Sequence, residues 1–323
     1  MIRFDKMKIV SPIEFVEILD YSKFECKVKD DCISEYRFSI LSPYLLYVEV
    51  DYIEQELVLE FTGKILGDDY PQLINKDTIR QCLDHINQLG FCRLNIDAIL
   101  SYGDVVKADV CCDVDYPDTQ ELSQLVRSCI GNYKKYLARE VGGNLIVEKN
   151  VSTKSYQQRL TIYNKELELQ RNCNRKFLEL VGDCDRLLDN FKGKTRFELN
   201  LNSKEQLRKA LCISDTSIES VLSSDANPIW AMLDKVLVDV DDAGVCHNLN
   251  ELKNLLLLQH CGGDLAKVEA LLRQHLSPKT HISKVMKPYR ILRDKLSNVD
   301  RGSIKNVLMN LLAEIVIFFV FVA

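Results

Sequence analysis

The fold is decided by three stretches in which polar and apolar residues alternate: Asp109-Val-Cys-Cys-Asp113-Val-Asp115, Arg159-Leu-Thr-Ile-Tyr163-Asn-Lys165-Glu166-Leu-Glu168 and Arg196-Phe-Glu198-Leu-Asn200. Alternation of this kind is typical of β-strands, because successive side chains of a strand point to opposite faces of its sheet. Each stretch therefore predicts a strand whose polar residues share one face. We expect these faces to hold Asp109, Asp113 and Asp115; Arg159, Thr161, Tyr163 and Lys165; and Arg196, Glu198 and Asn200.

If the three faces converge, they combine a hydroxyl nucleophile, a lysine and several carboxylates, which is the inventory for metal-assisted attack on a phosphodiester. A tyrosine hydroxyl has a pKa near 10 and needs activation at neutral pH. Lys165 is expected to lower that pKa, and a bound metal polarises the phosphoryl oxygen. The ordinary alternative is that Tyr163 is a half-buried strand tyrosine.

Hard oxygen ligands favour Mg²⁺ or Mn²⁺ as the metal. Three carboxylates on one strand face repel one another unless a cation or basic side chains lie there, so the pattern favours a site over an exposed edge strand. A cross-strand salt bridge to Arg196 is the alternative role for Glu198. No two histidines are one residue apart, so any metal rests on carboxylates. The natural candidate ligands are Asp109, Asp113, Asp115 and Glu198.

The bulk composition is that of a globular protein. Of the residues, 46% are hydrophobic and 28% are charged. The length of 323 residues is enough for two domains. The twelve cysteines are scattered without a C-x-x-C pair, and no signal-peptide run opens the chain. We interpret them as reduced thiols of a cytoplasmic protein without a zinc site. The apolar end, Ile315 to Ala323, is too short for a membrane helix and is expected to form a terminal strand.

The net charge of −5 is unevenly distributed. Residues 124–210 hold 18 Lys/Arg against 10 Asp/Glu, and residues 253–301 hold 10 against 4, whereas the stretches before and between them are acidic. Basic blocks of this kind are expected where a protein contacts nucleic-acid phosphates, although solvated helix faces give the same count.

The order of the predicted elements favours an α+β class with a curved, mainly antiparallel sheet backed by helices, since the βαβ rhythm of a parallel sheet is missing. After Ser203 strand signals nearly vanish. We therefore predict a domain over residues 1–202 and a mainly helical domain over 203–323, in which Gly262-Gly263 joins two helices as a plain hairpin or a helix-turn-helix. Strands are predicted at 45–51, 56–61, 94–99, 105–116, 144–151, 159–169 and 195–201, and helices from 77, at 117–138 and at 175–188.

At these residues the sequence resembles the replication initiators of rolling-circle plasmids and filamentous-type phages, the Rep_trans-like replication initiation factor family. An Asp-x-x-x-Asp strand matches Asp109 and Asp113, and an Arg-x-Glu strand matches Arg196 and Glu198. Between them, Ile162-Tyr163-Asn164-Lys165-Glu166-Leu167-Glu168 matches the family's (Ile/Val)-Tyr-(Asp/Asn)-Lys-x-x-Glu segment. The likeness covers about residues 105–202.

The resemblance implies a metal-dependent nickase that cuts one DNA strand at an origin and stays joined to the 5′ phosphate through Tyr163. It further implies that Lys165 neutralises phosphate charge. The implied metal ligands are Asp109, Asp113 and Glu198, with Asp115 or Glu168 as a further ligand. The DNA is then expected to lie on the sheet, near Arg159 and Arg196. The expected partners are origin DNA, single-stranded at the nick, host helicase and polymerase, and a second copy in a homodimer; no membrane is expected.

Three alternatives remain at this point. A conjugative relaxase uses the same chemistry on a transfer origin. A sequence-specific DNA-binding protein without catalysis uses the basic block 253–301 and keeps the strands as scaffold. A structural or virion protein shows no salt-dependent affinity for DNA.

Overall fold

The computed structural model describes residues 2–128, 130, 136–150, 157–237, 249–261, 264–277, 280–296 and 312. They fall into two compact units. Unit 1 draws on residues 1–123, 133–233 and 311–323, and unit 2 on residues 124–132 and 234–310. Unit 1 contains a large antiparallel sheet backed by helices, which confirms the predicted α+β class.

Ten strands form the main sheet of unit 1. Every pairing in it is antiparallel. In spatial order the strands are β3 (Glu25–Lys29), β4 (Cys32–Ile40), β5 (Leu46–Asp51), β6 (Glu56–Thr62), β1 (Phe4–Pro12), β8 (Asp104–Asp115), β12 (Lys194–Leu201), β11 (Arg159–Asn164), β10 (Asn144–Lys149) and β9 (Tyr136–Val141). A small second sheet pairs β2 (Val16–Ile18) with β7 (Cys92–Leu94).

The sheet consists of two halves with the same strand order. In each half the first strand of the sequence lies at the centre of the sheet (β1 or β8), and the next four run from the outer edge inwards. The two central strands pair with each other, so β5 has in the first half the place that β11 has in the second. This correspondence supplies an internal control for the site described below.

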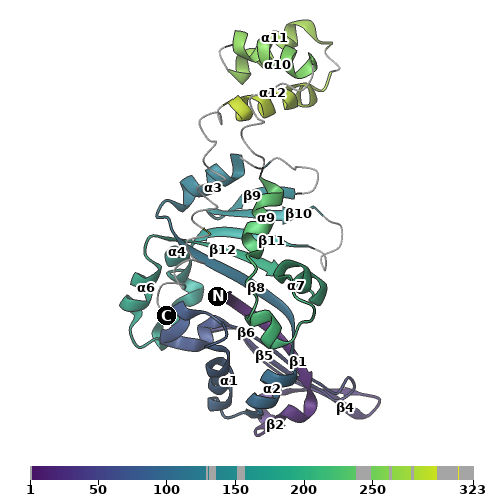
Figure 1. Cartoon of the computed structure of the whole chain (residues 1–323), viewed down its shortest axis with the longest axis vertical. Coiled ribbons are helices and arrows are strands. Elements are labelled where there is room, and N and C mark those ends of the chain that lie inside the picture. The colour runs from purple at the N-terminus through teal and green to yellow at the C-terminus, as the bar shows by residue number, and fades with distance from the viewer. Residues whose placement is uncertain are drawn as a thin grey trace. The chain divides into compact units, whose positions relative to one another are not determined.

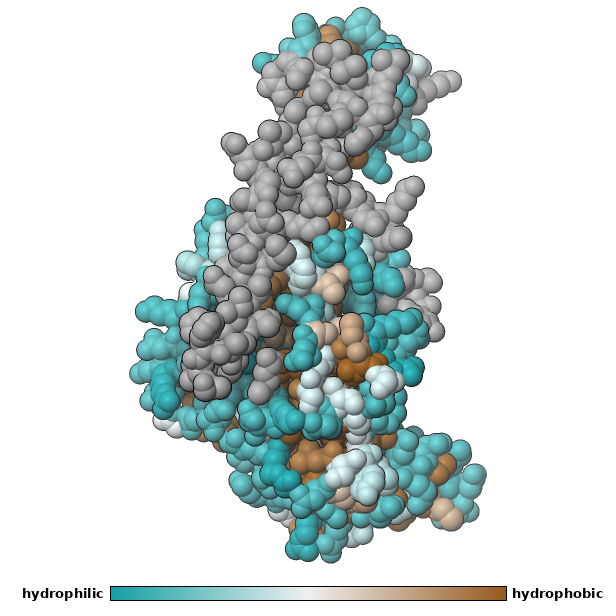
Figure 2. Space-filling model, viewed as in Figure 1, coloured by the Kyte–Doolittle hydropathy of each residue, from teal (hydrophilic) through white to brown (hydrophobic). Residues whose placement is uncertain are grey.

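The alternation of residues gives the sheet one apolar and one polar face. In β5, for example, Leu46, Val48 and Val50 are buried while Tyr47 and Glu49 are partly exposed. The apolar face carries α2 (Ile96–Tyr102) against β1, and α7 (Lys204–Leu211) and α8 (Ile218–Leu222) against β8. Figure 1 shows α7 in front of the sheet, and Figure 2 shows a mainly hydrophilic surface with hydrophobic patches on that side.

The polar face is open over part of its area and covered over the rest. A second apolar cluster, which includes Tyr70, Cys111, Leu169, Phe177 and Phe191, covers the face at the carboxyl end of β8. Apart from Cys111 of β8, most of its residues come from η3 (Gly63–Gln72), α4 (Lys165–Leu169), α5 (Arg175–Leu180) and α6 (Cys184–Phe191). The remaining helices in the described part of the chain are α1 (Ile79–Gln88), α3 (Thr119–Ser128), α9 (Pro228–Val236), α10 (Leu249–His260), α11 (Leu265–His275) and α12 (Ile282–Leu296), with short 3-10 turns at Ile13–Phe15, Tyr21–Lys23 and Asn172–Asn174.

Three predicted boundaries are wrong because a short polar side chain begins a helix. Asn164 accepts a hydrogen bond from the Leu167 backbone, so β11 ends there and α4 begins, in place of a strand through residue 169. Asn95 caps α2 in the same way, where a strand over 94–99 was predicted. Asp183 caps α6 and divides the predicted helix 175–188 into α5 and α6.

The helix predicted over 117–138 is too long, since α3 ends at Ser128 and Ala138 lies in β9. The predicted domain boundary also differs from the division into units, because residues 203–233 belong to unit 1. The described part of unit 2 is helical, and α10, α11 and α12 share a core that includes Leu258, Val268 and Met286. The Gly262-Gly263 connection and the apolar end at 315–323 lie outside the described residues.

Candidate functional site

Strand pairing brings the polar residues of β1, β8, β12 and β11 together on one face. Residues directly opposite each other in an antiparallel pair lie on the same face. Tyr163 lies opposite Arg196, which lies opposite Asp113. These three residues form one row across the strands. A second row, four residues away along β11, runs from Arg159 through Asn200 and Asp109 to Lys6. Glu198 lies between the two rows. The predicted convergence of the three polar strand faces is therefore present.

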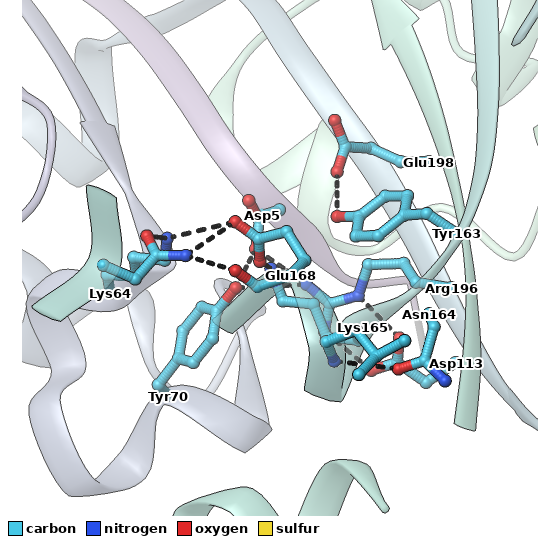
Figure 3. Close-up of polar contacts among 12 residues, drawn as sticks. Asp5, Lys64, Tyr70, Asp113, Tyr163, Asn164, Lys165, Glu168, Arg196 and Glu198 are labelled. Atoms are coloured by element: carbon cyan, nitrogen blue, oxygen red, sulfur yellow. Dashed lines mark hydrogen bonds and ion pairs between the residues drawn. The ribbon is translucent and has the colours of Figure 1, made fainter. Parts of the chain in front are cut away.

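The hydroxyl of Tyr163 donates a hydrogen bond of 2.7 Å to Oε2 of Glu198 (Figure 3). Burial, together with the negative charges of Asp5 and Asp109, raises the pKa of Glu198 to about 7. Burial and the Glu198 charge also raise the pKa of Tyr163 well above its usual value. The net pKa of Tyr163 is therefore raised, in place of the lowering expected from Lys165. The hydrogen bond therefore joins a tyrosine hydroxyl that is a weaker acid than usual to a carboxylate, Glu198, that is a stronger base than usual.

Asp109 and Arg159 are joined through Asn200. The Asn200 amide donates a 2.6 Å hydrogen bond to Asp109, and its oxygen accepts a 3.0 Å bond from Nε of Arg159. Asp109 is only 7% exposed, and burial raises its pKa. Arg159, in contrast, is exposed on the open part of the face, where a DNA contact was predicted.

Arg196 is fully buried beneath the Tyr70 and Phe191 rings. Its Nε and Nη2 atoms donate to both oxygens of Asp113, at 2.6 and 2.7 Å. Its Nη1 donates to Asp5 at 2.8 Å. In this arrangement Asp113 has both oxygens engaged by an arginine, and Arg196 has no surface for DNA. The predicted roles of Asp113 as a metal ligand and of Arg196 as a DNA contact do not fit this geometry.

Lys165 and Glu168 lie on α4, beneath the site. Nζ of Lys165 is 2.7 Å from Glu168 and 5.6 Å from the centre of the Tyr163 ring, and the side chain is almost fully buried. Glu168 also lies 3.7 Å from Nζ of Lys64 and accepts a 3.0 Å bond from Asn174. These cations hold the pKa of Glu168 below its usual value although burial acts to raise it. Glu168 is thus part of an ion network, not a free metal ligand.

Asp5 belongs to the site but was missed from the sequence. The β1–β8 register shifts between Phe4 and Lys6, which makes Asp5 the extra residue of a β-bulge and turns its side chain towards Arg196. Tyr70 donates a 2.6 Å hydrogen bond to the same carboxylate. Burial acts to raise the Asp5 pKa, but Lys165 and Arg196 hold it well below its usual value. In Phe4-Asp5-Lys6-Met7 two polar residues follow each other, which interrupts the alternation of polar and apolar residues in β1. This interruption was the sequence signal for the bulge.

The five predicted metal ligands do not form one coordination sphere. Asp113 and Glu168 are saturated by basic groups, and Asp115 is an exposed end residue opposite Lys194. Among the described residues, the acidic group whose ligand atoms lie within 4.8 Å of one another is Glu35, Glu49 and Asp51.

That acidic group lies in the first half of the sheet, away from Tyr163. Glu35 there is already ion-paired with Lys27 and Arg37, each at 2.9 Å.

Asp109 and Glu198 are the predicted ligands that remain. Each has one oxygen engaged by a described side chain and a second that no described group hydrogen-bonds. Two carboxylates suffice for Mg²⁺ or Mn²⁺, because water and substrate phosphate complete the coordination of such ions. The residues present therefore fit a small metal site, although not the five-carboxylate site.

The sequence matches no known family model and no curated protein. In the described part of the chain, no helix combines the length and the apolar character that crossing a membrane requires. The ten described cysteines are all free thiols.

Proposed function

We propose that the chain is a rolling-circle replication initiator, a metal-dependent endonuclease that nicks one strand of origin DNA and becomes linked to the 5′ phosphate through Tyr163. The observation that supports this most strongly is the buried hydrogen bond from the Tyr163 hydroxyl to Glu198, on the polar face of the sheet. A tyrosine paired with a basic carboxylate is the arrangement that an activated hydroxyl nucleophile requires.

In the proposed step, Oη of Tyr163 attacks the phosphorus of the scissile phosphodiester. The Tyr163 proton passes to Glu198, the P–Oη bond forms and the bond to the 3′ oxygen breaks. The departing 3′ oxygen takes a proton from water and becomes a free 3′-OH. Because Glu198 accepts the proton as the bond forms, no free phenolate is needed despite the raised pKa of Tyr163.

Asp109 and Glu198 are the residues proposed to hold Mg²⁺ or Mn²⁺. When bound, the ion supplies Lewis-acid polarisation of the phosphate and neutralises its charge. The Lys165 ammonium is buried against Glu168 and lies under the Tyr163 ring. It does not contact the reacting atoms and acts on the site through its positive charge. Lys165 is therefore proposed as a positioning residue. The protein would act in the cytoplasm, where host helicase and polymerase use the free 3′-OH.

The direct test is incubation of the full chain with supercoiled replicon DNA and Mg²⁺ or Mn²⁺. We expect open-circular DNA with protein attached to its 5′ end, stable to denaturation with detergent. Addition of EDTA should abolish the product, and excess Mg²⁺ should restore it. DNA binding without any adduct under either metal would refute the nickase and favour the non-catalytic DNA-binding protein.

The raised pKa of Glu198 predicts a pH dependence. Nicking should increase as the pH rises through the pKa of Glu198, because only the deprotonated carboxylate accepts the Tyr163 proton. This pKa is about 7 without a metal and falls when Mg²⁺ or Mn²⁺ binds beside the carboxylate. Glu198→Gln should lower the rate by about 10²- to 10⁴-fold, the usual contribution of a general base, and remove this inflection. A wild-type profile without any inflection at or below about pH 7 would contradict this role.

Folding stability offers a readout of the same carboxylate that needs no DNA. The folded-state pKa of Glu198 lies above its ordinary value of 4.5, so the folded state binds more protons between these pH values. The contribution of Glu198 to stability is therefore fully present below about pH 4.5 and is lost as the pH rises to about 7. Thermal unfolding of Glu198→Gln should lack this component of the pH dependence.

A further inference from the structure

An open pocket of about 420 Å³ lies on the polar face beside the Tyr163–Glu198 pair. All of its lining residues are polar or charged, among them Lys6, Lys107, Arg159, Asn200 and Gln157. Its volume lies within the range of sites for small organic ligands. Its position follows from the strand pairing, since the row from Arg159 to Lys6 forms its floor.

The pocket has more cationic groups than its acidic neighbours neutralise. Lys6 is ion-paired with Glu60 at 2.8 Å, whereas Lys107 forms no ion pair within 4.0 Å among the described residues and feels Glu60 and Asp109 only at longer range. Lys107 also lies directly opposite Lys8 across the β1–β8 ladder. Like charges in directly opposite positions destabilise a sheet, and a bound anion would relieve that repulsion.

Arg159 is held in place for a ligand on the open side. Its Nε is anchored on Asn200, and Asn200 is anchored in turn on Asp109. The two terminal nitrogens of its guanidinium have no hydrogen-bond partner among the described residues. A guanidinium fixed at one nitrogen and free at the others is suited to a phosphate, which accepts two parallel hydrogen bonds.

We propose that this pocket binds a nucleotide of single-stranded DNA through its phosphate, next to the scissile phosphodiester, with Lys107 and Arg159 as the phosphate contacts. Arg159 and Tyr163 are four residues apart on β11, about 13 Å at the usual rise of a strand, so one oligonucleotide reaches both. The assignment of DNA as the ligand rests on the proposed function. The charge and shape of the pocket do not depend on it.

The test measures the affinity of the Tyr163→Phe chain for a fluorescent single-stranded oligonucleotide in EDTA, where no cleavage is possible. Lys107→Ala and Arg159→Ala in that background should each weaken binding about tenfold, as expected for a charge-assisted hydrogen bond. Each should also reduce the slope of log K against log salt by about 0.7. Lys107→Arg should restore most of the affinity.

The matched controls are Lys209→Ala and Arg80→Ala, which remove exposed basic side chains elsewhere on unit 1. They should change the affinity by less than about twofold, in line with the small effects of such surface sites. Affinities of the Lys107 and Arg159 variants that match these controls would overturn the proposal. Tighter binding of the equivalent RNA would overturn the assignment of DNA.

Failure of the pocket and failure of the nickase give different results. Binding that depends on Lys107 and Arg159, without an adduct in the wild type, would support the pocket and refute the nickase. Adduct formation with unaltered affinity in both variants would support the nickase and refute the pocket.

Discussion

Replacement of Tyr163 by phenylalanine is expected to abolish the covalent protein–DNA adduct while the affinity for single-stranded DNA stays within about twofold. The substitution removes only the hydroxyl, and the ring keeps its buried position on the polar face of β11. Loss of a hydroxyl nucleophile in an enzyme costs on the order of 10⁶-fold in rate. The adduct should therefore fall below detection in a denaturing gel.

Tyr47→Phe is the matched control for this experiment. Tyr47 lies on β5, the strand that corresponds to β11 in the first half of the sheet, and its hydroxyl also donates to a carboxylate, that of Glu49. The Tyr47 variant should form the adduct at the wild-type rate. Equal adduct yields from the two variants, whether high or low, would contradict a specific role for Tyr163.

Replacement of Arg196 by methionine is expected to destabilise unit 1 by about 3–5 kcal/mol. The guanidinium is fully buried and bonds to Asp113 and Asp5, so its loss removes the direct ion-pair partner of two carboxylates. Removal of one partner from a buried ion pair has a cost of this size. The measurement is denaturant unfolding followed by the fluorescence of Trp230, the single tryptophan of the chain, which lies in unit 1.

Arg80→Met is the control for the unfolding experiment. Arg80 forms an exposed ion pair with Asp97, and exposed pairs contribute about 0–1 kcal/mol. Adding Asp113→Asn to Arg196→Met should recover part of the lost stability, because it removes one of the unpaired charges. A midpoint for Arg196→Met equal to that of Arg80→Met would show that the buried network does not stabilise the fold.

Residue alternation predicted the part of the site that depends on strand faces. Glu198, Tyr163 and Asp109 lie on one face as their spacing indicates, because the period of a strand is set by its backbone. The same argument failed where a side chain ends the strand. The Asn164 side chain accepts a hydrogen bond from the Leu167 backbone, which ends the strand and begins α4. The alternation of apolar and polar residues continues to residue 169 and therefore does not reveal this helix start.

The partners of the carboxylates were beyond sequence reasoning for a different reason. Three aspartates on one face correctly indicated a need for positive charge, but the cation of Asp113 is Arg196, brought there by pairing of β8 with β12. Lys64 and Tyr70 enter the network from η3, far away in the sequence. Contacts of this kind depend on the strand order of the whole sheet, which local patterns do not contain.

The central claim is that Tyr163 is the residue that becomes joined to DNA. The most direct measurement is to trap the wild-type adduct with origin DNA and Mg²⁺, digest the protein and the DNA, and sequence the nucleotide-bearing peptide by mass spectrometry. The account predicts a single modified residue, Tyr163, linked through its oxygen to a 5′ phosphate. A nucleotide on any other residue, or no modified peptide from a reaction that has nicked the DNA, would contradict it.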